Sequence, residues 1–299
     1  MKILIAEYAA SHDPKLAPEG RAMLDVLTRS FTKIGYTVLS PETGKDFSEE
    51  ITRLGQMCEE GLVIAPDNML AGFTKKLEDV TRNIGCNSFT VAICANKKKT
   101  GQILKSHGID VPLEVTSGRR IVKQVTGCGA VGVRLTEMPA GDGEFGQEYI
   151  EGEHYSVSLV GGRVVGEVCM YYTGKKPLFL ALNRQDISFE KDGTVRYLGG
   201  ETPVDHPKKD EMYAIASKAV EVLGCQGYVG VDMVVSSDRI VVVDVNPRPT
   251  TSIIGIDACM EEEIAQVILD ASYGRSPESV HLKGHAFFSS EGQVTYDRD

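Results

Sequence analysis

The stretch GYVGVDMVVSSDRIVVVDVNPRPTTS, residues 227–252, decides the fold of this chain. Within it, two apolar runs rich in valine and isoleucine, residues 228–235 and 240–245, flank a short polar turn. This pattern predicts a β-hairpin. Because side chains alternate along a strand, Asp232 lies on one face of the first run and Asp244 on one face of the second. A turn with an odd number of residues would bring these two faces to the same side of the sheet.

The hairpin therefore carries two carboxylates, and Asn246 continues the face of Asp244. Carboxylates in strands that are otherwise nearly all valine are unfavourable unless they are paired or bound to a cation. Two carboxylates and an amide oxygen suit Mg²⁺ or Mn²⁺, especially when phosphate oxygens complete the coordination shell. Arg248, stiffened by a proline on each side, is suited to bind a phosphate or a carboxylate bidentately. We favour a metal–phosphate site; the alternative is an exposed hairpin face with two ordinary acids.

Composition describes an ordinary globular protein. The chain has 299 residues, of which 42% are hydrophobic and 25% charged, and its net charge of −10 disfavours wrapping around a nucleic-acid backbone. Only four apolar residues lie between Lys2 and Glu7, too few for a signal peptide, and no apolar run approaches the length of a membrane span. The seven cysteines form no C-x-x-C pair, so we expect reduced, mostly buried thiols in a cytoplasmic protein.

The first 88 residues alternate strand and helix patterns. Strands are predicted at 2–6, 37–39 and 62–65, and helices at 19–34, 47–58 and 70–84. Alternation of this kind predicts a small parallel α/β domain. A further helix begins after Asn96 and runs to about residue 107, with three lysines, residues 97–99, in its first turn. Cations at this end of a helix dipole suggest a bound anion, although a merely solvated lysine run is the alternative.

The glycines of residues 119–135 spell G-x-G-x-x-G, but no helix pattern follows them, as a dinucleotide-binding motif would require. Valine, leucine, proline and further glycines follow instead, so we predict a hairpin whose glycine-rich tip covers phosphates with backbone N–H groups. Lys123 lies in the middle of the first strand, where an unpaired ammonium group is unfavourable. Either a phosphate or a salt bridge to a neighbouring strand would account for it.

Strands are predicted next at 147–150, 155–160 and 163–172, with the acidic turn EGEH between the first two. This turn suits the hinge of an adenine site, or is an acidic turn on the surface. Residues 175–188 are polar and irregular, which predicts a substrate loop. Helices are expected at 207–223 and 261–271, and one or two edge strands in the remaining residues.

A helix-leading lysine, a strand lysine before a glycine-rich hairpin, an acidic hinge and a D…D-x-N-P-R hairpin, in this order, resemble the ATP-grasp superfamily over roughly residues 90–275. The resemblance implies an α/β (α+β) fold in which two subdomains clasp ATP. Residues 1–88 would form the preceding domain and 89–299 the ATP-grasp domain, with a mobile lid at about 115–150 and a metal-binding subdomain at 151–299. Segments such as A-P-D-N (65–68), G-E-H-Y-S-V-S-L (152–159) and N-P-R-P-T-T (246–251) further resemble archaeal members that join an amine to an amino acid in cofactor biosynthesis.

Members of the family convert a carboxylate into an acyl phosphate with ATP, after which an amine displaces the phosphate. By position, the resemblance assigns Asp232, Asp244 and Asn246 to two divalent cations, Mg²⁺ or Mn²⁺. It assigns catalysis at the transferring phosphate to Lys123 and Arg248. The residues implied for ATP binding are Lys97, Lys123, Gly127, Gly129, Gly132, Glu148, Tyr149, Ile150, Glu151, Glu153 and His154, and those implied for substrate binding are Asn183, Arg184 and Gln185. Many members carry Glu in place of Asp244 and an acid in place of His154.

Three alternatives stay open. A ligase of the same family for another amine or amino acid would keep every residue above and change only the substrate pocket. A nicotinamide-dependent oxidoreductase would need a helix after Gly132, and a nucleotide sensor without catalysis would not need both carboxylates and Asn246. The expected partners are small molecules, an amino acid and an amine, rather than nucleic acid or a membrane, and a homodimer is kept open as the assembly state.

Overall fold

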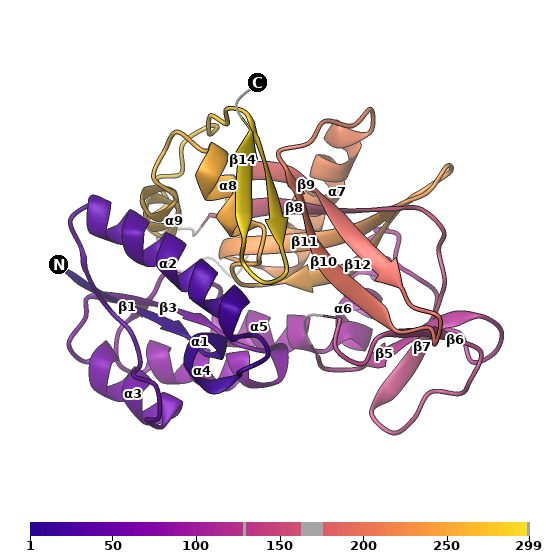
Figure 1. Ribbon diagram of the computed structural model, residues 1–299, viewed down its shortest axis with the longest axis horizontal. Helices are drawn as coiled ribbons and strands as arrows, with labels where there is room; N and C mark the ends of the chain where they lie inside the picture. The colour runs from indigo at the N-terminus through magenta and orange to yellow at the C-terminus, as the bar shows by residue number, and fades with distance from the viewer. Residues whose placement is uncertain (128–129, 163–175, 298–299) are drawn as a thin grey trace.

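The computed structural model describes residues 1–127, 130–162 and 176–297, which form three β-sheets flanked by helices. Figure 1 places a parallel sheet from the N-terminal part of the chain on one side, a small sheet on the other, and a large antiparallel sheet between and above them. The predicted fold class, an α/β (α+β) ATP-grasp fold that begins with a small parallel sheet, is confirmed.

The N-terminal sheet has the strand order β2-β1-β3-β4 and is parallel throughout. Its strands and the helices around it agree with the predicted alternation, apart from the short helix at Ala9–His12, which was not predicted, and the end of the third helix. That helix stops at Glu78 rather than near Ile84, because Arg82 and Asn83 pair with β3 as a short fourth strand. The elements are β1 (Lys2–Glu7), α1 (Ala9–His12), α2 (Ala17–Lys33), β2 (Thr37–Leu39), α3 (Phe47–Gly55), β3 (Glu60–Ile64), α4 (Asp67–Glu78) and β4 (Arg82–Asn83).

Two helices, α5 (Ser88–Ala95) and α6 (Lys97–Ser106), connect this sheet to the rest of the molecule. The sequence did not predict α5, because its residues are apolar on nearly every side and show no helical periodicity. The predicted helix after Asn96 is confirmed as α6. The side chain of Asn96 caps it by accepting a hydrogen bond from the backbone N–H of Lys99 at 3.0 Å.

The small sheet has the order β6-β5-β7 and consists of β5 (Arg120–Gln124), β6 (Arg134–Thr136) and β7 (Glu144–Glu148). The described residues between β5 and β6 contain no helix, and the two strands pair antiparallel, as the hairpin prediction required. The small sheet is joined to the large one by backbone hydrogen bonds, from Leu135 N–H to the Gly193 carbonyl and from Val195 N–H to the Val133 carbonyl. Figure 1 shows this contact at the tips of β9 and β10.

The large sheet is antiparallel and has the order β12-β11-β8-β9-β10-β13-β14. The predicted irregular loop at 175–188 is wrong for the described part of that stretch, which is the long strand β9. The predicted strand at 163–172 lies outside the described residues. The strands are β8 (Glu153–Gly161), β9 (Leu178–Phe189), β10 (Val195–Thr202), β11 (Gly227–Val235), β12 (Ile240–Asn246), β13 (His285–Ser289) and β14 (Val294–Asp297).

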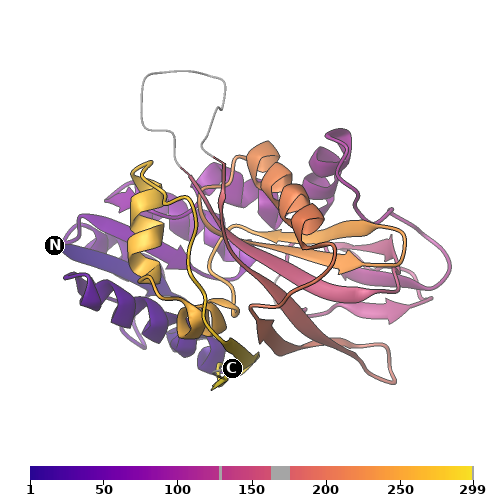
Figure 2. The same ribbon diagram turned by 90° about the horizontal axis from the view of Figure 1, so that it is seen from above.

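The remaining helices are α7 (Lys209–Leu223), α8 (Ile253–Cys259) and α9 (Ile264–Ser272). Figure 2 shows α7 lying along one face of the large sheet, where its buried side chains contact β8 and β11. On the other side, α2 packs against α8 and α9, so that this helix is shared by the N-terminal sheet and the C-terminal part of the chain. Within the described residues, no helix combines the length and the apolar character needed to cross a bilayer.

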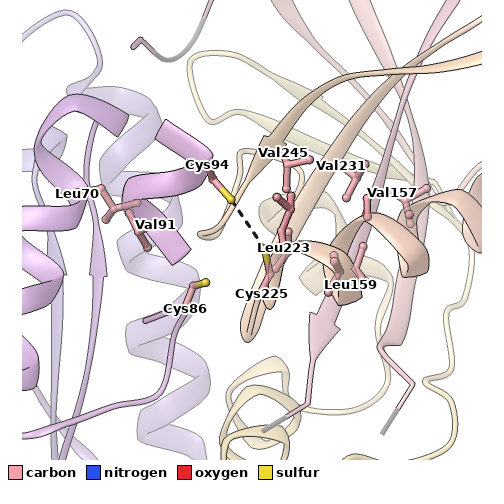
Figure 3. Close-up of a cluster of buried hydrophobic side chains, with 14 of the residues drawn as sticks. Leu70, Cys86, Val91, Cys94, Val157, Leu159, Leu223, Cys225, Val231 and Val245 are labelled. Atoms are coloured by element: carbon pink, nitrogen blue, oxygen red, sulfur yellow. Dashed lines mark hydrogen bonds between the residues drawn. The ribbon is translucent and has the colours of Figure 1, made fainter. Parts of the chain in front are cut away.

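One continuous apolar core joins the N-terminal sheet to the large sheet. Leu70 of α4 and Val91 of α5 are 1% exposed and belong to the same buried cluster as Val157, Val231 and Val245 of the large sheet. Figure 3 shows these side chains facing one another across the junction, together with Cys86, Cys94 and Cys225. The sulfur atoms of Cys94 and Cys225 lie 3.9 Å apart as free thiols. The sheets are therefore held in a fixed relation by buried surface.

Candidate active site

The hairpin β11–β12 places Asp232 directly opposite Asp244. The turn that joins the strands, residues 236–239, has an even number of residues, so the turn alone would not bring the two faces to the same side. A β-bulge supplies the missing residue: Met233 pairs with Val242 and Asp232 with Asp244, and the ladder skips Val243. Paired residues point to the same face of a sheet, so both carboxylates and Asn246, which pairs with Gly230, share one face.

Each carboxylate has its own set of hydrogen-bond donors. Asp232 accepts from the side-chain amides of Asn246 at 2.9 Å and Gln185 at 3.1 Å, whereas Asp244 accepts from the ammonium group of Lys97. Burial, and next the charge of Asp244, raises the pKa of Asp232 to about 7. Burial would raise the pKa of Asp244 as well, but Lys97 and Lys123 outweigh it and hold that pKa below its ordinary value.

Lys97 enters the site from the first turn of α6. Its backbone N–H donates to the Val125 carbonyl at 2.9 Å, which ties the start of this helix to the end of β5. Its ammonium group lies between Asp244 and Asp67, with 3.5 Å to the latter. Burial alone would lower the pKa of Lys97, but the two carboxylates raise it above its ordinary value. The side chain therefore stays cationic in a buried position.

Lys123 projects from the middle of β5 and is only 8% exposed. Its ammonium group donates to the backbone carbonyl of Val243 at 3.0 Å. Val243 is the bulge residue, so the departure from regular pairing that brings the two carboxylates together also provides an acceptor for this lysine. The partner is a carbonyl rather than the salt bridge that the sequence left open. Burial lowers the pKa of Lys123 to about 8.

These side chains face one cleft of about 250 Å³. Its walls come from the small sheet, the large sheet, the start of α6 and the start of α2. The lining residues are Glu19, Lys97, Pro112, Ile121, Lys123, Gln124, Gly127, Ala130, Val131, Val133, Gln147, Glu148, Tyr149, Ile150, His154, Ser156, Gln185, Ile187, Phe189, Val195, Tyr197, Asp232, Val234, Val243, Asp244, Asn246, Arg248, Thr250, Thr251 and Ser252.

The segment predicted as an adenine hinge runs from the end of β7 to the start of β8. Tyr149, Ile150 and His154 line the cleft beside apolar residues of β9, and burial lowers the pKa of His154, which favours a neutral imidazole. The carboxylate of Glu148 accepts from Leu113 N–H at 3.0 Å and pairs with Arg239 at 3.1 Å. Two residues predicted here, Glu151 and Glu153, are exposed and do not line the cleft.

The glycine-rich tip between β5 and β6 contributes Gly127, Ala130 and Val131 to the cleft wall. Gly132 adopts a φ of 73°, which favours glycine, but does not line the cleft. The predicted ligand residue Gly129 lies outside the described residues. Ala130, which the motif did not single out, adopts a φ of 58°, a conformation that is uncommon for a residue with a side chain.

The three residues predicted to bind substrate lie in different surroundings. Gln185 lines the cleft and holds Asp232. Asn183 is fully buried, and its amide donates to the hydroxyl groups of Ser156 and Ser158 at 3.0 Å each, so it supports the strands of the cleft wall. Arg184 points to the other face and pairs with Glu201 at 3.0 Å.

Two acidic residues of the site were not predicted as site residues, although Asp67 belongs to the quoted segment A-P-D-N. Asp67, at the start of α4, is 6% exposed and lies between the ammonium group of Lys97 and the guanidinium group of Arg248, 3.6 Å from the latter. Glu19, in the first turn of α2, lines the cleft and accepts a hydrogen bond from Thr251. Both come from the N-terminal 88 residues, where surface helix starts carry acids routinely, so composition alone does not distinguish them.

The acidic face of the hairpin fits a hard divalent cation. Two carboxylates and an amide oxygen are oxygen ligands, and the remaining positions would be left to water and phosphate. The raised pKa of Asp232 reflects two buried like charges that a cation would neutralise. Among the described residues there is no cluster of three or more His, Cys, Asp and Glu side chains that could hold a metal without such added ligands.

Comparison with known proteins gives consistent results. The model of the ATP-grasp domain matches residues 94–252, more than half of the chain. The tyramine–L-glutamate ligase of Methanocaldococcus jannaschii is 31% identical over 85% of this chain and 84% of its own length. That of Methanocaldococcus fervens is 29% identical over 89% and 92%. A crystal structure of an ATP-grasp superfamily protein from Archaeoglobus fulgidus matches with a TM-score of 0.77 and 26% identity, covering 97% of this chain and 92% of that one.

The residues matched by the domain model include α6 with Lys97, the small sheet with Lys123 and the hairpin with both carboxylates. The order of these features is the one on which the resemblance rested, and it holds over the length of the domain. The chain belongs to the ATP-grasp family.

Proposed function

We propose that this protein is an ATP-dependent carboxylate–amine ligase that joins tyramine to the γ-carboxyl group of L-glutamate, a step of methanofuran biosynthesis. The observation that carries the proposal is the pairing of Asp232 with Asp244 on one face of the hairpin, beside Lys97 and Lys123, in a single cleft. The names of the two Methanocaldococcus relatives support the choice of substrates.

In the proposed reaction, an oxygen of the substrate carboxylate attacks the γ-phosphorus of ATP, and the bond to ADP breaks. The ammonium form of the amine loses one proton, the neutral nitrogen attacks the acyl carbon, the bond to phosphate breaks, and the nitrogen loses a second proton to solvent as the amide forms. Phosphoryl transfer depends mainly on positioning and on neutralising charge. Lys97, Lys123 and Arg248 would supply fixed positive charge along the phosphates. The small sheet would exclude water that hydrolyses the acyl phosphate.

Asp232, Asp244 and Asn246 would hold two divalent cations, Mg²⁺ or Mn²⁺, which when bound neutralise phosphate charge. Lys97 forms an ion pair with Asp244, so the charge of this lysine acts directly on the face proposed to bind the cations. Asp67 would keep Lys97 and Arg248 directed into the cleft, since it lies between their charged groups. The hinge residues Tyr149, Ile150 and His154 would receive the adenosine part of ATP.

We further propose that residues 115–150 act as a lid within an ATP-grasp domain of residues 89–299, preceded by a domain of residues 1–88. The small sheet supports this, because its described polar contacts with the large sheet are backbone bonds at Leu135 and Val195, the Lys123–Val243 bond and the Glu148–Arg239 ion pair. Apolar contact is found at the end of the segment, where Ile150 packs with Val234 and Val241. The polar contacts separate at lower free energy than a buried apolar face.

An ADP-release screen tests the proposed function. The protein is incubated with ATP, Mg²⁺ and a panel of acids and amines, and the amide product is identified by mass spectrometry. The expected result is ADP, phosphate and γ-glutamyltyramine in equal amounts, only when both L-glutamate and tyramine are present. Turnover with a different acid–amine pair would support the ligase function but change the proposed substrates. Nucleotide binding without ADP release for any pair would contradict the ligase and favour a sensor.

A further inference from the structure

One part of the cleft is not used by the phosphate and metal residues. It is lined by Glu19 from α2, Tyr197 from β10, and Thr251 from the segment that follows the hairpin. The Thr251 hydroxyl donates to the carboxylate of Glu19, and Tyr197 lines the same part of the cleft. Burial, followed by the charges of Glu19 and Asp232, raises the pKa of Tyr197, so its phenol stays neutral between these two acids.

Glu19 differs from the other acids of the cleft wall. Asp232 and Asp244 belong to the metal-binding face, and Glu148 is paired with Arg239. Among the described residues, no lysine, arginine or histidine lies within ion-pair distance of Glu19, although the charge of Arg248 acts on it from farther away. Its hydrogen-bond donor, Thr251, is a neutral hydroxyl. The negative charge of this half-buried carboxylate is therefore only partly neutralised by neighbouring groups. The carboxylate is able to bind a cationic group that enters the cleft.

The chemistry of the proposed reaction supplies such a group. At neutral pH the amine substrate carries a primary ammonium group, and so does the α-carbon of the amino acid. The cations of the cleft, Lys97, Lys123 and Arg248, would attract the phosphates and the carboxylate and repel an ammonium group. Glu19 comes from a different element, the N-terminal helix α2, and faces the same cleft as these cations.

We propose that the carboxylate of Glu19, held by Thr251, binds the primary ammonium group of a substrate and thereby positions that substrate for ligation. The proposal rests on the ligase function proposed above and adds a residue to it. The ammonium group belongs either to the amine or to the α-carbon of the amino acid, and the experiment distinguishes the two. In both cases Glu19 is a substrate-binding residue supplied by the N-terminal part of the chain, outside residues 94–252.

Steady-state kinetics of the full-length Glu19→Gln variant test the proposal. We expect the KM of one ammonium-bearing substrate to rise roughly 10- to 100-fold, the usual effect of losing a hydrogen-bonded ion pair. The KM of ATP should stay within about twofold. Glu19→Asp should recover part of the affinity. Asp25→Asn is the matched control, because Asp25 lies on the same helix, carries the same charge and is exposed. It should leave every KM unchanged.

Uncharged analogues identify the source of the ammonium group. Glutarate lacks the α-ammonium group of L-glutamate, and 2-(4-hydroxyphenyl)ethanol lacks the ammonium group of tyramine. If the amino acid is bound, Glu19→Gln raises the KM of L-glutamate and leaves that of glutarate unchanged. If the amine is bound, the variant raises the KM of tyramine and leaves inhibition by the alcohol unchanged. Unchanged KM values for both substrates, or equal effects on charged and uncharged analogues, would overturn the proposal.

Two further outcomes separate this proposal from the proposed function. Amide formation by the wild type together with unaltered KM values in Glu19→Gln refutes the role of Glu19 alone. If no acid–amine pair gives an amide, the proposed ligase function is refuted. The role of Glu19 is then tested by calorimetric titration, which measures the affinities of tyramine and L-glutamate for the wild type and for Glu19→Gln. Weaker binding to the variant than to the wild type supports its role, whereas no binding or equal binding refutes it. If the variant does not fold, the same analogues are titrated into the wild-type protein. Equal affinities for the charged substrates and their uncharged analogues would also refute the role of Glu19.

Discussion

At the scale of single residues, the site is a balance of buried charges. Asp232, Asp244 and Asp67 face Lys97, Lys123 and Arg248, and each pKa that is shifted is shifted mainly by burial and by the charges of neighbouring residues. Buried charges contribute little net stability, because desolvation opposes their attraction, so such an arrangement points to function rather than to folding. Substitutions here should change turnover more than the fold.

The first prediction concerns the face of the hairpin that we propose to bind metal. Asp244→Asn and Asp232→Asn should each lower ATP turnover by at least about 1,000-fold, because a divalent cation contributes several kcal/mol to stabilising the transferred charge. ADP release measures this. Asp238→Asn is the control, since Asp238 lies in the turn of the same hairpin and is exposed. Circular dichroism should show all three variants folded, and wild-type turnover by either site variant would remove these carboxylates from the mechanism.

A second residue-scale prediction concerns Glu7, which is 3% exposed at the end of β1. Burial raises its pKa to about 7, against the hydrogen bonds from the backbone N–H groups of Ala10 and Ala9. In the unfolded chain the carboxyl ionises near 4.5, so folding is progressively disfavoured as the pH rises from 4.5 through 7. Glu7→Gln should remove this penalty and stabilise the protein at pH 8 by up to roughly 3 kcal/mol, with little effect below pH 4.5.

Urea unfolding of wild type and Glu7→Gln at pH 4 and pH 8 measures the effect. The exposed residue Glu278 offers the control, because Glu278→Gln removes the same charge without altering a buried group. A gain for Glu7→Gln that is equal at both pH values would show that packing, rather than ionisation, is responsible.

At the scale of elements, α6 and the hairpin position the charged residues. The helix begins at Lys97 because Asn96 caps it, and the cap also fixes the backbone from which the Lys97 side chain projects. The hairpin brings its carboxylates together through the bulge at Val243 rather than through the length of its turn. Bulges bend a strand and free one backbone carbonyl from the ladder, which here holds Lys123.

The cap provides the element-scale prediction. Asn96→Ala should destabilise the protein by about 1 kcal/mol, because the Lys99 N–H then loses its acceptor at the start of the helix. For a chain of this size the melting temperature should fall by a few degrees, roughly 2–4 °C. Asn96→Asp keeps a side-chain oxygen and serves as the control, with a melting temperature near that of the wild type. Equal loss in both variants would mean that the cap is not what stabilises this end.

At the scale of the whole molecule, the N-terminal sheet and the large sheet share one core. Val91 on α5 belongs to the buried cluster that includes residues of both sheets, whereas Phe89 on the same helix is 76% exposed. We therefore expect the N-terminal sheet and the large sheet to unfold together, since neither can separate without exposing this apolar surface.

Val91→Ala tests this expectation. The variant should lose about 2 kcal/mol of stability through the removed methyl groups and the cavity they leave. Far-ultraviolet and near-ultraviolet circular dichroism should give one transition at the same denaturant concentration, shifted equally from that of the wild type. Phe89→Ala, the control on the same helix, should shift it little. Two separate transitions in Val91→Ala would show that the sheets unfold independently.

The sequence by itself determined the elements whose patterns are local. The valine-rich hairpin, the capped lysine helix, the strand and turn around the glycines and the parallel N-terminal alternation all follow from periodicity, caps and turn residues. The order of Lys97, Lys123, Asp232 and Asp244 was sufficient to indicate the family. These features persist because each is stabilised within a short segment, where neighbouring residues decide the conformation.

Only the tertiary structure decided which polar residues meet. β9 resembled a loop because one of its faces is turned toward a polar cleft, so its alternation includes Gln185 where an apolar residue is expected. The bulge at Val243 leaves no sequence signature, yet it sets the face of Asp244. Asp67 and Glu19 enter the site from helices more than 150 residues away from the hairpin in the sequence, and contacts over such separations depend on how the sheets pack. Burial, which a sequence does not display, then shifts the pKa values on which the chemistry of the cleft depends.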